Sequence, residues 1–526
     1  MDVDSRFRGN DEEFAGKADP GTGAVWRRSY ERTADPVQPV GWPRLHPPAV
    51  LRILGISALF VCVAPLIPSE DLSNTFKVAA CVSLLSVFAL LPTGLKVNSG
   101  NAAVCFPGAP FAMLNFVYFV PSSLMPLIFP NGYYGTISFA SLGSSLVILA
   151  LAFLCFDLGI LMSGIVPRIH GLSATYVRRI SGLRATTIAA LAALWTARIV
   201  LARMGFGITH VPSMVIADTS VSQISVLSES LAYVPLALCL TRICSLAGRG
   251  YEFCAWRRWF LCIFVTDLLY YVLAGSRLGL LWEILISVWV LWSRRVRLIP
   301  KIVTPVLVLA LVSIVPLIYG QRAALNAVRP QLGEDHLRLT REYLPTAEDS
   351  LLGQNLKTTM EEGIEADAGR LTAVGPFSGV MERVLSGRYS LMWGATLAAE
   401  TPLLIPRLIW AEKSIGENVD YVISRHFDLD STDELTTCET ELLANFGIIG
   451  LCLGMLGYGF ITERICAPLQ AHSAVSEPMM FLILAAMPLV FRVETDITSI
   501  FAGLRVLVPI WLVLRIFEHR RGTCES

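Results

Sequence analysis

Charged residues are scarce in this chain. Asp, Glu, Lys and Arg make up 16% of its 526 residues, against about 25% in an average soluble domain, whereas hydrophobic residues make up 54%. The hydrophobic residues gather in blocks of about 20, the length of helix that crosses a bilayer. This pattern argues against a soluble enzyme, a secreted disulfide scaffold and a disordered chain. It predicts an all-α polytopic membrane protein.

Motifs for nucleotide and metal binding are also missing. The sequence has no Walker A loop, no GxGxxG after a strand, no HExxH, no GxSxG and no DxD pair in a cytoplasmic domain. No CxxC and no Cys/His pair has the spacing of metal ligands. Only Cys438 of the twelve cysteines falls in the one long loop, residues 320–441, so that loop holds no internal disulfide. We therefore expect no cofactor and no metal, and, for an enzyme, a substrate that brings its own activated bond.

Twelve apolar blocks predict transmembrane helices. They lie at residues 49–68, 77–95, 106–129, 138–161, 185–203, 224–241, 259–274, 278–292, 302–319, 442–461, 478–491 and 500–514. The third block contains four prolines, which indicates a kinked or broken helix. Residues 1–48 lack the pattern of a signal peptide, and we expect a disordered cytoplasmic tail there. The predicted organisation is thus a tail (1–48), nine helices (49–319), a large external loop (320–441), three helices (442–514) and a cytoplasmic tail (515–526).

Lys and Arg are absent from three of the short loops. The loop holding Glu70 and Asp71 and the loops at residues 131–137 and 205–223 carry none, whereas the loops at residues 165–184, 242–258 and 293–301 carry four each. Cytoplasmic loops retain positive residues, so the arginine-rich loops are predicted to face the cytoplasm. The other loops and the stretch 320–441 then face outward, and both termini are cytoplasmic.

Two groups of basic residues lie on the predicted outer face, close to span ends. Arg277 sits in the very short turn Gly-Ser-Arg-Leu-Gly at residues 275–279, and Arg322 follows the ninth block. An Arg at such a place can hold a phosphate by two parallel hydrogen bonds or anchor a helix end at the lipid surface. The sequence leaves both roles open for each group.

Two further groups lie later in the long loop. An apolar segment at residues 390–404 leads to Arg407 and Lys413, and it is either an interfacial or re-entrant segment that holds these cations at headgroup level or an amphipathic packing helix. The last group is either a polar site or a solvated loop end with a helix cap, and its members are Arg425, His426, Glu439, Glu441, Asn445, Phe446 and Gly447.

The order of these elements carries a resemblance. GSRLG between two spans, a large external loop, an IPR-x-x-W-x-x-K element and then ELLANFGIIG running into a span resemble the bacterial O-antigen and exopolysaccharide repeat-unit polymerases, the Wzy-like family. The resemblance covers roughly residues 270–459. It implies a GT-C-like architecture in the bacterial inner membrane. It also implies metal-independent transfer of an oligosaccharide from a polyprenyl diphosphate at the periplasmic face, with a chain-length regulator protein as a possible partner.

The resemblance suggests roles for individual residues. Arg277, Arg322 and Arg407 are expected to contact the diphosphate, with Lys413 and Arg425 as second choices, because preorganised positive charge stabilises a leaving group that gains negative charge. Glu441 or His426 is expected to orient or deprotonate the acceptor hydroxyl. We expect residues 445–447 to cap and pack the start of the tenth span.

Two alternatives remain open from the sequence. An O-antigen ligase-type glycan transferase shares the span pattern and the large loop. A lipid-linked oligosaccharide flippase or transporter belongs to a different class, although no pair of matching halves is visible. Few charged residues lie inside the predicted spans, namely Asp157, Arg198, Glu229, Asp267 and Glu283. Of these, Asp267 and Glu283 flank the turn that holds Arg277.

Overall fold

The structure is a computed structural model, and it describes a little under half of the chain. The described residues are 44–45, 47–63, 72–99, 102–105, 115–116, 119–120, 123, 139–165, 182–203, 228, 231–246, 251–273, 283–284, 287, 374–404, 419–429, 437–470, 477–490, 497, 500 and 507–516.

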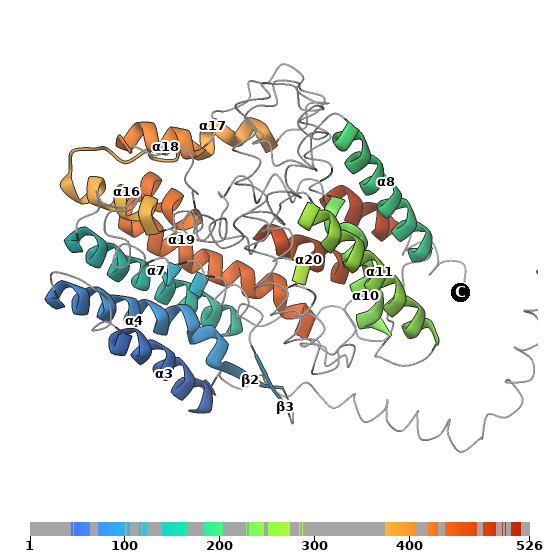
Figure 1. The fold of residues 1–526 in the computed structure, drawn as a ribbon, viewed down its shortest axis with the longest axis horizontal. Helices are drawn as coiled ribbons and strands as arrows, with labels where there is room; N and C mark the ends of the chain where they lie inside the picture. The colour runs from blue at the N-terminus through green and yellow to red at the C-terminus, as the bar shows by residue number, and fades with distance from the viewer. Residues whose placement is uncertain are drawn as a thin grey trace, which may run out of the picture.

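Four long helices lie in a row (Figure 1). They are α3 (Pro47–Val63), α4 (Leu72–Gly94), α7 (Phe139–Ile165) and α19 (Cys438–Gln470), and each packs against the next in that order. Each is predominantly apolar, as expected of a helix that faces lipid on one side and protein on the other. Leu51 of α3 and Ile449 of α19 are examples of large apolar side chains left exposed.

A second group of helices lies beside this row (Figure 1). It contains α8 (Leu183–Arg203), α10 (Val234–Ser245), α11 (Tyr251–Leu273) and α20 (Glu477–Val490). The buried helix α10 contacts α8, α11 and α20, and α20 contacts α19, which joins the two groups.

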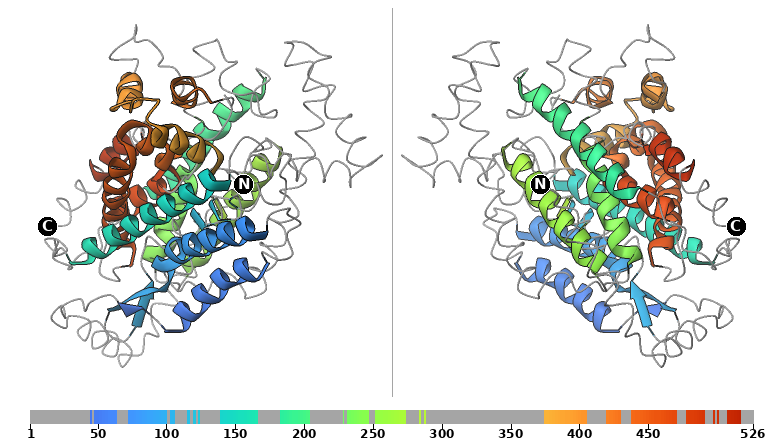
Figure 2. Two further views of the ribbon diagram at one scale, coloured as in Figure 1. Left: turned by 90° about the vertical axis from the view of Figure 1, so that its left-hand side faces the viewer. Right: turned by 90° about the vertical axis from the view of Figure 1, so that its right-hand side faces the viewer.

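Three shorter helices cover the end of α19. They are α16 (Val374–Ser386), α17 (Ala395–Leu404) and α18 (Val419–Phe427). Figures 1 and 2 show them in orange, on the opposite side of α7 and α19 from α3. Amphipathic α16 buries Val374, Phe377, Val380 and Met381 and packs on both α7 and α19.

The all-helical prediction is confirmed for most of the described residues, but a small sheet departs from it. Strand β2 (Leu95–Ser99) continues directly from α4 and pairs antiparallel with β3 (Ala102–Cys105) and with β1 (Arg44–Leu45). The sequence 95–99 alternates apolar and polar residues, which favours a strand over a continued helix. Strand β1 falls inside the segment expected to be a disordered tail.

Three described helices have the length and apolarity of membrane spans. They cover Ser141–Ser163, Leu183–Leu201 and Cys438–Arg464, with mean hydropathies of 2.5, 1.3 and 1.7. Shorter apolar helices cover Lys77–Leu91, Val234–Ser245, Glu477–Met487 and Leu507–Ile516. The chain is therefore a membrane protein with several candidate transmembrane helices, and the total of twelve stays a prediction.

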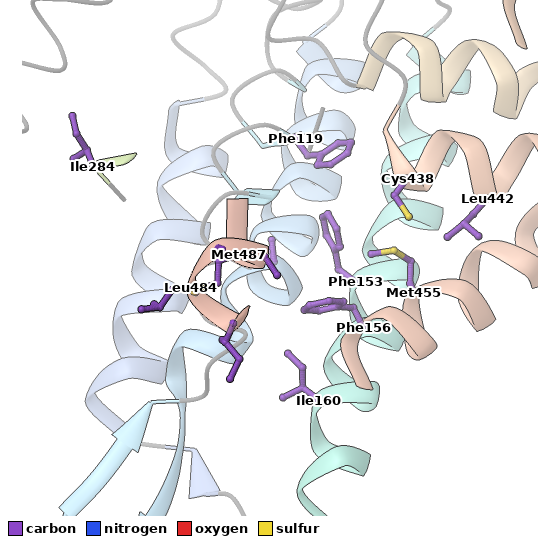
Figure 3. Close-up of a cluster of buried hydrophobic side chains, with 14 of the residues drawn as sticks. Phe119, Phe153, Phe156, Ile160, Ile284, Cys438, Leu442, Met455, Leu484 and Met487 are labelled. Carbon is purple, nitrogen blue, oxygen red and sulfur yellow. The ribbon is translucent and has the colours of Figure 1, made fainter. Parts of the chain in front are cut away.

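Helices α7 and α19 approach closely through a pair of glycines. A Cβ added to Gly159 would lie 2.0 Å from the carbonyl oxygen of Leu456, and one added to Gly459 would lie 2.1 Å from that of Phe156. Small residues are what allow membrane helices to pack backbone to backbone. Beside this crossing, Phe153 and Phe156 of α7 face Met455 of α19 in a cluster that Leu484 and Met487 of α20 complete (Figure 3).

Candidate functional site

The first turns of α19 are separated from the rest of the helix by a break at Gly447. Its backbone has φ 67° and ψ −165°, a region that is essentially restricted to glycine. A helix break frees carbonyl groups of the preceding turn, which then need donors from elsewhere. Here the N–H of Met392 donates to the carbonyl oxygen of Ala444 at 3.1 Å, and the N–H of Trp393 donates to that of Asn445 at 2.9 Å. The break therefore docks the segment before α17 onto α19.

The side chain of Asn445 reinforces this docking. Its Nδ2 donates to the hydroxyl oxygen of Thr396 at 2.7 Å and to the carbonyl oxygen of Glu441 at 2.9 Å, while its Oδ1 accepts from the N–H of Gly394 at 2.9 Å. Asn445 and Thr396 are fully buried. Asn445 is thus the centre of a buried polar network between α17 and α19.

Glu441 extends the network to a third segment. Its Oε1 accepts from the Thr396 hydroxyl at 2.7 Å, and its Oε2 accepts from the N–H of Ile497 at 2.8 Å. The carboxylate is buried completely. Hydrogen bonds from a side chain and from a distant backbone group fix its orientation and hold residues 396, 441 and 497 together.

His426 ties α18 to the same segment. Its Nε2 lies 2.8 Å from the carbonyl oxygen of Ser390, and since a carbonyl oxygen only accepts, Nε2 carries the proton. In the neutral ring Nδ1 then holds the lone pair. The ring packs edge-to-face on Phe427 at 4.8 Å between centroids, and the side chain is only half-buried. His426 is therefore placed to exchange a proton with a molecule at this surface, which the buried Glu441 is not.

Exposed basic and aromatic side chains surround this segment. Arg388 and Arg425 are exposed, and the side chain of Trp393 is 74% exposed although its backbone has φ 51°. The left-handed conformation is unfavourable for a bulky residue, and it is held by the hydrogen bond from the Trp393 N–H to α19. The surface next to the buried network thus presents cations and an aromatic ring.

The expected site residues fall into two sets. Arg425, His426 and Glu441 are described, and the structure brings His426 and Glu441 to the two ends of one docked segment, residues 390–396. Four predicted diphosphate contacts lie outside the described residues: Arg277, Arg322, Arg407 and Lys413. For the described ranges, no group of three or more His, Cys, Asp or Glu side chains is arranged to hold a metal ion.

The interpretation of residues 445–447 was wrong in its detail. The helix cap is Thr437, whose hydroxyl accepts from the N–H of Thr440 at 3.2 Å and which occupies the usual N-cap position. Asn445 lies one helical turn after Glu441 and bridges to α17 instead. Gly447 permits a backbone break, whereas close helix approach belongs to Gly159 and Gly459.

Sequence reasoning missed Thr396 and Trp393. Thr396 is 45 residues from its partner Glu441, and nothing local marks a Thr in an apolar run as a partner of a distant carboxylate. The one available signal was Gly394 after Trp393, because a glycine inside an apolar segment often marks a turn. The structure places that turn immediately before α17.

Comparison with models of protein families gives no match to the chain. The curated proteins and the solved structures also yield no match. A function for this chain is therefore inferred from the geometry of the site and from the sequence motifs.

Proposed function

We propose that this chain is a bacterial inner-membrane polymerase that joins polyprenyl-diphosphate-linked oligosaccharide repeat units at the periplasmic face, as the resemblance to the Wzy-like family implies. The proposed architecture has twelve spans, cytoplasmic termini and a large periplasmic loop. The observation that carries the proposal is the half-buried His426, oriented by the Ser390 carbonyl on a surface that also presents Arg388 and Arg425.

The chemistry asks for a base on one side and positive charge on the other. The acceptor hydroxyl attacks the anomeric carbon of the donor sugar, the bond from that carbon to the diphosphate oxygen breaks, and the polyprenyl diphosphate leaves with the electron pair. A neutral imidazole whose Nδ1 holds the lone pair can accept the hydroxyl proton. Arginines stabilise the charge that develops on the leaving diphosphate, and Arg425 on α18, with Arg277, Arg322, Arg407 and Lys413 from the sequence, is proposed for that role.

Glu441 is assigned a positioning role within this proposal. Its carboxylate is buried and accepts hydrogen bonds from Thr396 and the Ile497 N–H, so it is not disposed to meet a substrate hydroxyl. It holds in place the segment whose Ser390 carbonyl orients His426. Loss of Glu441 is therefore expected to act through the placement of that segment.

Reconstituted transfer tests the proposal. The purified full-length chain in lipid vesicles receives synthetic polyprenyl-diphosphate repeat units, and gel electrophoresis follows the polymer. His426→Gln retains an amide donor for the Ser390 carbonyl but removes the basic nitrogen, and we expect it to slow polymerisation about 10²- to 10⁴-fold at normal protein levels. Glu382→Gln on the exposed face of α16 is the matched control and should leave the rate unchanged.

The products separate this function from its rivals. Longer lipid-linked chains support a polymerase, whereas movement of finished polymer onto a different acceptor, with no lengthening, indicates a ligase-type transferase. Transport of the unit across the vesicle membrane without any new glycosidic bond indicates a flippase. A full rate in His426→Gln refutes the assignment of the base.

A further inference from the structure

A second polar cluster is buried between α8, α11 and the short described segment at residues 283–284. Arg198, Asp267 and Glu283 meet there, with side chains 2%, 1% and 1% exposed. Arg198 Nη1 donates a hydrogen bond to Asp267 Oδ1 and forms an ion pair with it. Asp267 and Arg198 are the charged neighbours of Glu283. Arg198 and Asp267, 69 positions apart, are thus paired directly, and Glu283 is buried within electrostatic range of both.

Aromatic rings enclose the guanidinium group. Its Cζ lies 3.8 Å from the ring centroid of Tyr270, 5.2 Å from that of Trp195 and 5.6 Å from that of Tyr271. A cation over an aromatic face is stabilised most where water is excluded. The rings therefore fix Arg198 in a dry environment and strengthen every electrostatic interaction near it.

The charges of the cluster do not balance when all three groups are ionised. One guanidinium faces two carboxylates, and Asp267 takes up the one positive charge. Neither oxygen of Glu283 has a hydrogen-bond partner. An unpaired carboxylate in a low-dielectric interior is so costly that the group takes up a neutralising cation instead.

We propose that Arg198, Asp267 and Glu283 form a binding site for one proton, which Glu283 carries while Arg198 pairs with Asp267. Arg198 retains two nitrogen atoms, Nε and Nη2, without partners, and Asp267 retains Oδ2. The guanidinium can therefore turn to Glu283 as the proton moves from Glu283 to Asp267. Each arrangement contains one carboxylic acid, one carboxylate and one guanidinium, so charge and protons balance.

The composition of the site favours a proton over a metal ion. A guanidinium inside the cluster repels a metal cation, and the described residues contain no group of three or more metal-binding side chains. Among the described residues, the further titratable group in electrostatic range of both carboxylates is the phenol of Tyr271 on α11, which in turn interacts with the phenol of Tyr233, the N-cap residue of α10. Neutral phenols supply none of the missing positive charge.

The position along the helices indicates the side from which the proton comes. Arg198 lies near the C-terminal end of α8, Asp267 lies near that of α11, and Glu283 follows the turn that holds Arg277. The loop charges predict that all three ends face outward. The site thus exchanges its proton with the outside. The assignment of this site does not depend on whether the chain is a glycan polymerase. Loss of the proton leaves two carboxylates sharing one guanidinium, which weakens the contact between α8 and α11.

Infrared spectroscopy of the reconstituted full-length protein tests the site. The carbonyl stretch of a protonated carboxyl group is recorded at neutral pH for the wild type, for Glu283→Gln and for Asp157→Asn, a matched variant of another buried carboxyl group with unpartnered oxygens, on α7. We expect Glu283→Gln to lose one component of the band, which disappears from the wild type when the outer solution is made alkaline. Asp157→Asn should retain that component.

Two results would overturn the proposal. One is a protonated-carboxyl band that Glu283→Gln leaves unchanged, and the other is a component that vanishes at constant pH when sodium or potassium ions are added, which indicates a metal cation. Labelling glutamate with carbon-13 in the wild type shifts the same component if a glutamate carries the proton, and a component that does not shift would also overturn the proposal. This measurement needs no substitution, so it can refute the assignment even if the variant does not fold.

Discussion

Removal of the Asn445 side chain is the most direct test of how the candidate site is held together. Asn445→Ala deletes three hydrogen bonds, to Thr396, to the Glu441 carbonyl and from the Gly394 N–H. Each bond contributes about 1 kcal/mol net, and more where a buried partner is left unsatisfied. We therefore expect the free energy of unfolding to fall by about 3 kcal/mol, with faster proteolysis of residues 390–396.

The assay is unfolding of the detergent-solubilised protein by increasing fractions of a denaturing detergent, followed by helical circular dichroism. Asn445→Asp keeps the shape and the acceptor for Gly394 but removes both donors, and it places a second carboxylate beside Glu441. It should therefore destabilise at least as much as Asn445→Ala. Glu382→Gln, at an exposed position of α16, should stay within about 0.5 kcal/mol of the wild type. A change that small for Asn445→Ala would refute the claim that this side chain docks the segment onto α19.

The remaining predictions concern glycines of α19. Gly447→Ala should lower the free energy of unfolding by about 1 to 3 kcal/mol in the same assay, because its φ of 67° and ψ of −165° suit glycine alone. The new Cβ would also lie 3.3 Å from Leu391. An unchanged stability would mean that the break is not required. Gly459→Leu should separate α7 from α19, since even a Cβ meets the Phe156 carbonyl oxygen at 2.1 Å. The yield of disulfides formed between cysteines introduced on the two helices should therefore fall. Gly457→Ala, with nothing within 4 Å of its Cβ, should be neutral or stabilising by about 0.5 to 1 kcal/mol, and equal trapping in both variants would contradict the proposed crossing.

Hydropathy predicted the presence of the apolar helices more accurately than the residues at which they begin and end. Hydropathy placed a span at residues 138–161, close to α7 (Phe139–Ile165). It placed another span at residues 224–241, inside which α10 begins at Val234 with Pro235 in its first turn, a position that proline favours. It also missed the first turns of α11, which starts at Tyr251, because exposed Arg257 and Arg258 lower the hydropathy of a segment that is nevertheless helical.

The candidate site was predictable only where position in the chain carries the information. Glu441 and His426 were proposed as site residues because they are polar residues in the segment that leads to a predicted span. Their partners Thr396 and Ser390 were not, because a hydrogen bond across 45 or 36 residues depends on tertiary packing that no local pattern encodes. The pairing of Arg198 with Asp267 was missed for the same reason, although Asp267 was singled out as a charge inside a span.

The break at Gly447 changes where the loop predicted at residues 320–441 ends. Hydropathy draws the boundary at residues 441–442, at the start of an apolar run, but residues 438–446 share their hydrogen bonds with the segment before α17 and with Ile497. The close contacts of α19 with Gly159 and Phe156 of α7 are made by residues 456–460, after the glycine. A chimaera that exchanges this predicted loop between related membrane proteins should therefore be joined at residue 447, inside what is formally one helix, so that the loop keeps the turns of α19 to which it is bonded.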